Sequence, residues 1–449
     1  MLGIRWIVAV ASLGLALLIS GTGLVAGSFV DSETSLANAF QAWTSSQWLQ
    51  TTQVDFEAGI PSQADTRSSP GDVGLARDNH IFAFQGGSAN FWGYGVPANS
   101  WTSMTGTPNV VGPGGALAYD GSRYIYAFRG NTSTTFWRYD TTLNTWATLA
   151  NAPANVDTGG ALAHDGVRYI YAFRGNNQTA FWRYDTVLNS WAVRATALAR
   201  VGTGGSLAYD GARYVYAFRG NNQTTFWRYD TVLNSWAVRA TALARVGTGG
   251  SLAYDGSRYI YAFRGNTSTT FWRYDTTLNT WATRANAPAA VGAGGALAYD
   301  SLGYVYGFGG NGTAAFWRYD IPGNSWMSVA NAPASVANGG ALAFVAASTY
   351  VDSATTASQV RDAGVAGARW DGLFWDETIQ LNTDMTFEVR ASDTLFAQGD
   401  AAPVWTPVGG TSPVTSGLPT GRYMQWRATL TTSDTAVTPL LHEVRLYHY

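Results

Sequence analysis

Arginine recurs at one position in successive copies of a 45-residue repeat, directly after the tripeptide Tyr-Ala-Phe: Arg129, Arg174, Arg219 and Arg264. Two further arginines, Arg200 and Arg245, lie in segments that join the repeats. The planar guanidinium group binds carboxylate and sulfate through paired hydrogen bonds. These six residues predict a positively charged surface for an acidic polysaccharide or a carboxylate-rich matrix or envelope protein. The alternative is structural, because buried charges are usually paired, and each arginine would then bond a repeat aspartate such as Asp140 or Asp185.

Five repeats also contain an N-x-Ser/Thr triplet, which is the acceptor pattern for N-linked glycans. The triplets begin at Asn131, Asn177, Asn222, Asn266 and Asn311. In a host with the glycosylation machinery these asparagines would be modification sites. The favoured interpretation is simpler, because Asn, Ser and Thr are ordinary turn formers and a repeated loop repeats its triplet.

Other chemistry is excluded by composition. The chain of 449 residues has no cysteine, so disulfides, a thiolate nucleophile, cysteine-ligated zinc and a lipobox are ruled out. All 27 basic residues are arginine and the net charge is −2, with no basic run, which argues against nucleic acid and against membrane surfaces as partners. No metal or cofactor is expected. The C-terminal region has acidic residues that could ligate calcium, but their spacing does not match a calcium-binding loop. These residues are Asp371, Asp376, Glu377 and Asp384.

The sequence is dominated by a repeat, and this repeat must position the arginines and asparagines named above. Two tryptophan series recur every 45 residues, one from Trp92 to Trp317 and one from Trp101 to Trp326, which gives six repeats. One unit, 114–150, contains four short β-rich runs separated by turn residues and therefore predicts one four-stranded propeller blade. The small residues of its Gly-Ala-Leu strand are expected next to the propeller axis, where space is limited. Asp120-Gly121 is expected to form a two-residue hairpin turn. The tryptophans of both series are expected in the core.

These residues resemble the kelch family of β-propellers. The pattern appears as Gly114-Gly115, Tyr126 to Gly130, Tyr139-Asp140 and Asn144-Thr145-Trp146, and it recurs along about 270 residues (77–346). The six repeats and this resemblance imply a six-bladed propeller. Because the connections of a four-stranded antiparallel blade alternate between two faces, the longer loops are expected on one face, where four arginines at like positions would form a positive ring around the mouth. Kelch domains include galactose-oxidase-like copper enzymes, which need a cysteine–tyrosine crosslink and clustered histidines. This chain lacks cysteine, and its four histidines are scattered: His80, His164, His442 and His448.

The repeats are unusually alike. Residues 117–148 are identical to 252–283, and 181–211 are identical to 226–256. Catalysis needs an asymmetric set of groups with different roles, so near-identical blades favour a non-catalytic binding or structural protein over an enzyme. The alternative is a carbohydrate-active enzyme with its site on a divergent blade, either the first, with Gly93, or the sixth, with Gly307 to Gly310. Divergence of the end blades is equally expected from ring closure.

The N-terminal region predicts export. Residues 1–27 combine a short basic start, an apolar run and small residues, as in a secretory signal peptide, so an extracellular or cell-surface location follows. The alternative is an uncleaved anchor. The next segment, 28–76, opens with Phe29 to Ser35 and resembles the start of camelysin- and TasA-like surface and matrix proteins. That family's peptidase activity is not expected, since no metal site is evident.

The C-terminal region, 347–449, alternates strand-like runs with Pro and Gly turns and predicts a β-sandwich. It resembles jelly-roll or discoidin-like modules, which bind carbohydrates or surfaces. The chain also supplies one extra inner strand, 339–345, while the segment Gly71 to Ala76 departs from the inner-strand pattern. We therefore predict an all-β protein in which 339–345 closes the ring as the inner strand of the first blade. Residues 71–76 would join the sandwich, which makes the propeller an insertion in it.

Overall fold

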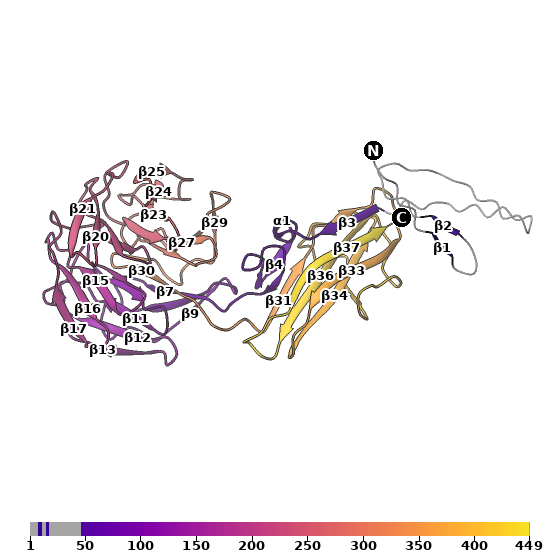
Figure 1. Ribbon diagram of the computed structural model, residues 1–449, viewed down its shortest axis with the longest axis horizontal. Coiled ribbons are helices and arrows are strands. Elements are labelled where there is room, and N and C mark those ends of the chain that lie inside the picture. The colour runs from indigo at the N-terminus through magenta and orange to yellow at the C-terminus, as the bar shows by residue number, and fades with distance from the viewer. Residues whose placement is uncertain (1–7, 11–14, 18–45, 449) are drawn as a thin grey trace, which may run out of the picture.

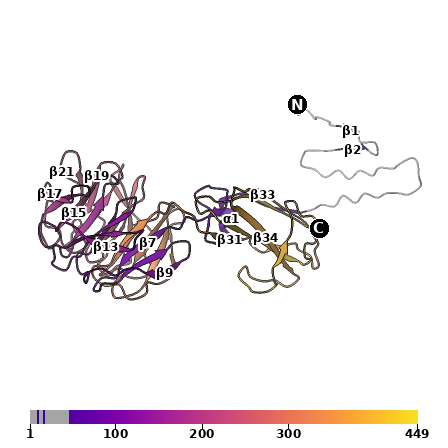
Figure 2. The same cartoon turned by 90° about the horizontal axis from the view of Figure 1, so that it is seen from below.

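The computed structural model describes residues 8–10, 15–17 and 46–448. Residues 46–448 form two β-rich bodies lying end to end (Figures 1 and 2). The predicted signal peptide falls almost wholly outside these residues. Only β1 (Val8–Val10) and β2 (Leu15–Leu17) are described there, and they pair antiparallel. The camelysin-like stretch, 29–35, lies outside as well. Within the described part of the chain, no helix is long and apolar enough to cross a membrane.

The larger body is a six-bladed propeller of four-stranded antiparallel sheets. The first blade contains β30 (Ala341–Val345), β7 (His80–Phe84), β8 (Phe91–Gly95) and β9 (Ser100–Ser103). The second contains β10 (Ala116–Tyr119), β11 (Tyr124–Phe128), β12 (Phe136–Asp140) and β13 (Thr145–Thr148). The third contains β14 (Ala161–His164), β15 (Tyr169–Phe173), β16 (Phe181–Asp185) and β17 (Ser190–Val193).

The remaining three blades repeat this order. The fourth contains β18 (Ser206–Tyr209), β19 (Tyr214–Phe218), β20 (Phe226–Asp230) and β21 (Ser235–Val238). The fifth contains β22 (Ser251–Tyr254), β23 (Tyr259–Phe263), β24 (Phe271–Asp275) and β25 (Thr280–Thr283). The sixth contains β26 (Ala296–Tyr299), β27 (Tyr304–Phe308), β28 (Phe316–Asp320) and β29 (Ser325–Ser328).

The ring closes as the sequence predicts. β30, from the end of the array, pairs antiparallel with β7, with Ala341 opposite Phe84 and Val345 opposite His80. The first blade therefore combines strands from both ends of the propeller chain. This pairing covers the inner edge of β7, which would otherwise be unpaired, and leaves six four-stranded blades with short, protected edges at the axis.

Small residues surround the axis and aromatic residues fill the space between blades. In the second blade Leu117 and Ala118 face the axial region, while Trp137 is 1% exposed. Phe136 meets the third blade, with ring centroids 4.8 Å from Tyr184 and 4.9 Å from Trp191. Such aromatic pairs add to the hydrophobic stabilisation of the wedge between blades. The prediction that the repeat tryptophans are core is confirmed for the first series, whose six indoles are at most 4% exposed, while the second series is half-buried between neighbouring blades.

A repeated clasp joins each blade to the one before it. In the fourth blade the Asn234 side chain accepts hydrogen bonds from its own Tyr229 hydroxyl (2.6 Å) and from the backbone N–H of Ala195 (2.9 Å). Trp236 donates its indole N–H to the carbonyl of the same Ala195 (2.9 Å). The Asn-x-Trp motif therefore bonds both the backbone N–H and the backbone carbonyl of one residue in the preceding blade. The same bonds recur around the ring, including the closing step from Asn99 and Trp101 to Ala330.

The inner hairpin differs from its prediction. Residues 120–123 separate β10 from β11, so the expected two-residue turn at Asp120-Gly121 is wrong. The Asp120 Oδ1 atom accepts the backbone N–H groups of Ser122, Arg123 and Tyr124 at 2.8 to 3.0 Å. An aspartate that bonds successive N–H groups stabilises a wider turn than a two-residue hairpin needs.

The smaller body is a β-sandwich built from both ends of the chain. One sheet has the order β3 (Ser46–Gln50), β37 (Leu440–His448) and β33 (Trp370–Thr378). The other has the order β35 (Thr406–Val408), β34 (Thr383–Ser392), β36 (Tyr423–Thr432), β31 (Ser353–Ala357) and β4 (Ile60–Ser62), and β32 (Arg361–Asp362) also pairs with β36. The short helix α1 (Gln53–Glu57) links β3 to β4.

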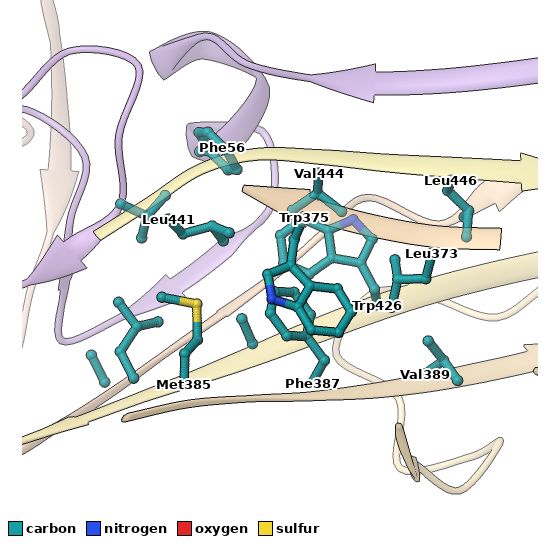
Figure 3. Close-up of a cluster of buried hydrophobic side chains, with 14 of the residues drawn as sticks. Phe56, Leu373, Trp375, Met385, Phe387, Val389, Trp426, Leu441, Val444 and Leu446 are labelled. Carbon is teal, nitrogen blue, oxygen red and sulfur yellow. The ribbon is translucent and has the colours of Figure 1, made fainter. Parts of the chain in front are cut away.

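Alternating residues of the two sheets form the sandwich core. Met424, Trp426, Ala428 and Leu430 point inward from β36 and are at most 1% exposed, as the period of two in a strand requires. Figure 3 shows Trp375 and Phe387 beside Trp426, and the Trp375 and Phe387 rings stack with centroids 4.2 Å apart. The sandwich therefore has a hydrophobic core of its own.

The propeller is inserted in the sandwich. After β5 (Ala64–Asp65) and β6 (Gly74–Leu75), the chain enters the propeller, and it returns at β31. Val73 bridges Leu441 of β37, and the Leu75 N–H bonds the Thr438 hydroxyl at 2.7 Å. The predicted joining of 71–76 to the sandwich is therefore confirmed.

Candidate functional site

The two faces of the propeller are built from different connections. The loop face is formed by the segments between second and third strands, such as 129–135, and by those leading into inner strands, such as 152–160. The turn face carries the tighter connections, such as 120–123 and 141–144. Isolated bridges such as Ser133 to Val156 tie the two kinds of loop-face segment together. Loops held in this way by a rigid scaffold are common sites of binding.

The four repeat arginines lie on the loop face but bond the backbone. Their Nε atoms donate to the carbonyls of the adjoining segment at 3.0 to 3.1 Å: Arg129 to Val110, Arg174 to Asn155, Arg219 to Arg200 and Arg264 to Arg245. The predicted alternative, pairing with Asp140 or Asp185, is wrong. Those carboxylates bond Arg123 and Arg168 instead, each at 2.7 Å on the turn face.

These contacts bring two arginine pairs together. Because Arg219 bonds the carbonyl of Arg200, and Arg264 that of Arg245, each pair joins a half-buried arginine to an exposed one. Over all six blades, the stretches equivalent to 129–135 and 152–160 contain six arginines and one acidic residue, Asp157, so their formal charge is +5. Three more arginines, Arg194, Arg239 and Arg284, directly follow outer strands and lie outside these stretches, and the first two bond tyrosine hydroxyls of the next blade. The Asp157 carboxylate accepts a hydrogen bond from the Thr132 hydroxyl at 2.6 Å.

The arginines do not surround the axial opening as expected. In the described part of the chain this opening is lined by Gly, Thr and Asn residues such as Gly114, Thr158 and Asn338, and by none of the six arginines. Close approach explains the glycines, since a Cβ on Gly114 (φ +82°) would lie 2.2 Å from the Asp157 carbonyl oxygen. The positive charge therefore forms an arc outside the opening.

The five sequon asparagines are exposed on the loop face. All have a left-handed backbone with φ between 53° and 58°, which asparagine tolerates better than most residues. Two also receive hydrogen bonds from neighbouring blades, from Asn221 to Asn177 at 3.1 Å and from Asn266 to Asn222 at 3.3 Å. This geometry gives the asparagines a turn-forming role, and their exposure leaves the predicted modification accessible.

The sixth blade uses a residue from the sandwich side of the chain. In the second to fifth blades an arginine such as Arg123 bonds the aspartate at the end of the third strand. The sixth blade has Gly303 at that position, and Arg67 takes the place of the missing side chain. Its Nη1 atom bonds Asp320 at 3.2 Å, its guanidinium lies 4.0 Å from the Tyr304 ring centroid, and its Nε bonds Glu57 at 2.9 Å.

Histidine and acidic residues do not gather into a metal site within the described residues, where no group of three or more such side chains is found. Asp371 pairs with Arg369 at 2.7 Å, and His442 bonds Asp72 at 2.7 Å. One histidine does stand out. His164 replaces the tyrosine or phenylalanine that other blades place around the turn-face opening of the axis, and burial lowers its pKa.

The strand pairing defines the chain as a six-bladed β-propeller inserted in a β-sandwich. No family model matches the sequence, and no curated protein matches it. Solved structures do match, among them the structure titled "Structure of YjhT", with 13% identity, a TM-score of 0.43, and coverage of 57% of this chain and 93% of that chain. Because this TM-score is below 0.5, the fold assignment does not depend on that structure. It rests on the strand order and register of this chain.

Proposed function

We propose that this protein is a kelch-type, non-catalytic binding protein of the cell exterior, and that its loop face binds an acidic polymer. The observation that carries the proposal is the charge of that face, with six arginines and one carboxylate on its segments. Arg200 and Arg245 are exposed there. Carboxylates and sulfates are the natural ligands of such groups.

The repetition of the face favours a repeating ligand. The pairs Arg200–Arg219 and Arg245–Arg264 occupy equivalent positions on neighbouring blades. A polymer with regularly spaced anionic groups would contact both pairs at once, and the second contact would be intramolecular. Acidic polysaccharides such as polyuronates fit this description, as do acidic stretches of a matrix or envelope protein.

The divergence of the sixth blade has a structural reason, which favours binding over catalysis. Gly303 replaces a larger residue of the repeat at the point where the Arg67 side chain lies on the turn face. A Cβ on Gly303 would lie 3.3 Å from the Nη1 atom of Arg67. The first blade differs where β30 completes it. These two departures accommodate other parts of the chain. The glycines Gly307 and Gly309 accommodate aromatic packing, since a Cβ there would lie 2.7 Å from Phe263 and 2.6 Å from Trp317.

Binding should be measured with polygalacturonate and with a sulfated polysaccharide. Affinity is expected to fall steeply from about 50 to about 500 mM NaCl, because salt screens exposed charges. The variant R200Q/R245Q should bind about tenfold more weakly, since two exposed charge contacts each contribute up to about 1 kcal/mol. The control R369Q/R445Q removes two arginines from the sandwich at the same net charge.

Three outcomes would contradict the proposal. They are salt-independent binding, equal affinity of R200Q/R245Q and wild type, and shortened polymer products after incubation with the protein. Products would instead support a carbohydrate-active enzyme. Binding of an acidic protein but of neither polysaccharide would assign the loop face to a protein partner.

The location is tested separately. If 1–27 is a cleaved signal peptide, mass spectrometry of the secreted protein should find an N-terminus between about Gly27 and Phe29, after the small-residue cleavage site. An intact Met1 in the membrane fraction would favour the uncleaved anchor.

A further inference from the structure

A pocket of about 540 Å³ lies where the sandwich side of the chain meets the first and sixth blades. Glu57, Gln63 and Arg67 line it from one side, and Asp300, Tyr304 and Arg318 from the sixth blade. This volume is within the range of small-molecule sites. The pocket is separate from the loop face, because the sixth-blade residues that line it belong to the turn face and the strands beside it.

Asp300 is a buried carboxylate with one unused oxygen. It is 1% exposed, and its Oδ1 atom accepts the backbone N–H groups of Leu302 (2.8 Å) and Tyr304 (2.9 Å). Among the described residues no donor reaches its Oδ2 atom. The equivalent aspartates of other blades, such as Asp255, are half-buried and not fully enclosed. The Oδ2 atom is enclosed by protein, and an unpartnered buried acceptor costs free energy. A small rotation of the Asp300 side chain that turns Oδ2 into the pocket and gives it a ligand donor would therefore be favourable.

Arg318 offers the complementary group. Its guanidinium lies 4.2 Å from the Tyr304 ring centroid and donates to the Met327 sulfur at 3.6 Å, and the Tyr306 hydroxyl lies beside it. It forms no salt bridge within residues 46–448. Arg67, by contrast, is already bonded to Glu57 and Asp320. The pocket therefore holds a free carboxylate oxygen and a guanidinium group without a carboxylate partner.

The charge of the lining points to a neutral ligand. Three arginines (Arg67, Arg77 and Arg318) and four acidic residues (Glu57, Asp65, Asp300 and Asp320) line the pocket, so the formal balance is −1. The loop face, at +5, is very different. A neutral ligand with neighbouring hydroxyls would donate to a carboxylate and accept from a guanidinium without adding charge. Trp326 supplies aromatic surface for its C–H groups, whereas the Tyr304 ring is already covered by Arg67 and Arg318.

We propose that this pocket binds one neutral sugar unit, with a ring hydroxyl donating to Oδ2 of Asp300 and another accepting from Arg318. The site is formed jointly by the propeller and the segment 57–79 of the sandwich side. It does not depend on the loop-face function proposed above, because the two sites would take ligands of different charge.

The full-length protein should be titrated with neutral sugars, namely glucose, galactose, mannose and N-acetylglucosamine and their β1-4 disaccharides, by calorimetry and saturation-transfer NMR. At least one sugar is expected to bind. D300N and R318M should each weaken that binding at least about tenfold, the loss expected for a charged hydrogen bond. The matched controls D255N and R273M alter the same positions of the fifth blade, where Arg273 lies 3.9 Å from the Tyr259 ring centroid, and should bind as wild type.

Hydrogen exchange of the wild-type protein gives a readout that does not depend on the variants. Saturating sugar should protect peptides covering 57–67 and 298–306, and not the equivalent peptide 253–261. The proposal is overturned if no neutral sugar binds, if D300N and R318M bind as wild type, or if the fifth-blade controls lose binding equally. The variant R200Q/R245Q should bind neutral sugars as wild type even if it loses polygalacturonate binding. The two measurements therefore test the pocket and the loop face separately.

Discussion

Asp300 occupies the same turn position as Asp120, Asp165, Asp210 and Asp255, yet it alone in this series is buried. Burial raises the pKa of Asp300 to about 6, because the surrounding protein disfavours its charged form. The folded state then holds a proton more tightly than the unfolded state, whose carboxyl has a pKa near 3.8. The contribution of Asp300 to stability is therefore most favourable below about pH 4 and is lost as the pH rises through about 6.

The variant Asp300→Asn should remove this pH dependence. At pH 7.5 its free energy of unfolding should exceed that of wild type by about 1 to 3 kcal/mol, since a shift of one pKa unit corresponds to about 1.4 kcal/mol. At about pH 4 the two proteins should be equally stable. Denaturant unfolding at both pH values measures the difference. Asp255→Asn is the control, and an equal gain in that variant would show that burial of Asp300 is not the cause.

At the scale of strands and blades, stability depends on contacts that repeat between neighbours. The Asn-x-Trp clasp explains why the motif needs asparagine. Asn234 has φ +51°, and its single side-chain oxygen accepts from both a tyrosine hydroxyl and a backbone N–H. Alanine has no acceptor and is strained in the left-handed region.

Asn234→Ala should lower the free energy of unfolding by about 2 to 3 kcal/mol, from two lost hydrogen bonds at about 1 kcal/mol each and the backbone strain. The neighbouring Leu233, 67% exposed, provides a matched control, because Leu233→Ala should change stability by less than about 0.5 kcal/mol. Denaturant unfolding followed by tryptophan fluorescence is the measurement. Equal stability of the two variants would contradict a structural role for the clasp.

The sequence predicted the repeating elements well because their signals are local. Spacing, small residues and aromatic alternation indicated the four strands of each blade, the closing strand β30 and the joining of 71–76 to the sandwich. The inner turn was mispredicted because a two-residue pattern does not show how many N–H groups Asp120 will bond.

The sites were harder to predict because their partners leave little trace in sequence. The strand connections of a four-stranded blade correctly predicted that Arg129 and its counterparts lie on the loop face. They did not predict the carbonyl partners of these arginines, since every residue carries a carbonyl. The role of Arg67 was missed because Asp320 lies 253 positions away. The available signal was indirect, namely the glycine at position 303 where the second to fifth repeats have arginine.

At the scale of the whole molecule, Arg67 links the sandwich side of the chain to the propeller. Its side chain is 14% exposed and bonds both Glu57 and Asp320. It therefore takes the place of the arginine that the second to fifth blades carry themselves. A contact of this kind fixes orientation more than it stabilises either body, because each body has its own core.

Arg67→Met should loosen the joint between the bodies while leaving each folded. Hydrogen exchange is expected to increase in 57–67 and 300–306, and small-angle scattering should show a broader range of interdomain distances. Arg123→Met is the matched control, since Arg123 bonds Asp140 within one blade and should affect only that blade. Unchanged exchange at 300–306 in Arg67→Met would contradict the linking role.

The placement of β3 beside β37 has a mechanical consequence. Ser46 pairs with His448, so tension applied at these two residues would pull apart neighbouring strands from one end. Such a load breaks backbone bonds one after another, as a zipper opens. Both crossings into the propeller lie side by side, with Val351 bonded to Ala76 at 3.0 Å, so little of the force would pass through the ring. Under tension the sandwich would open first and the binding faces of the propeller would keep their shape.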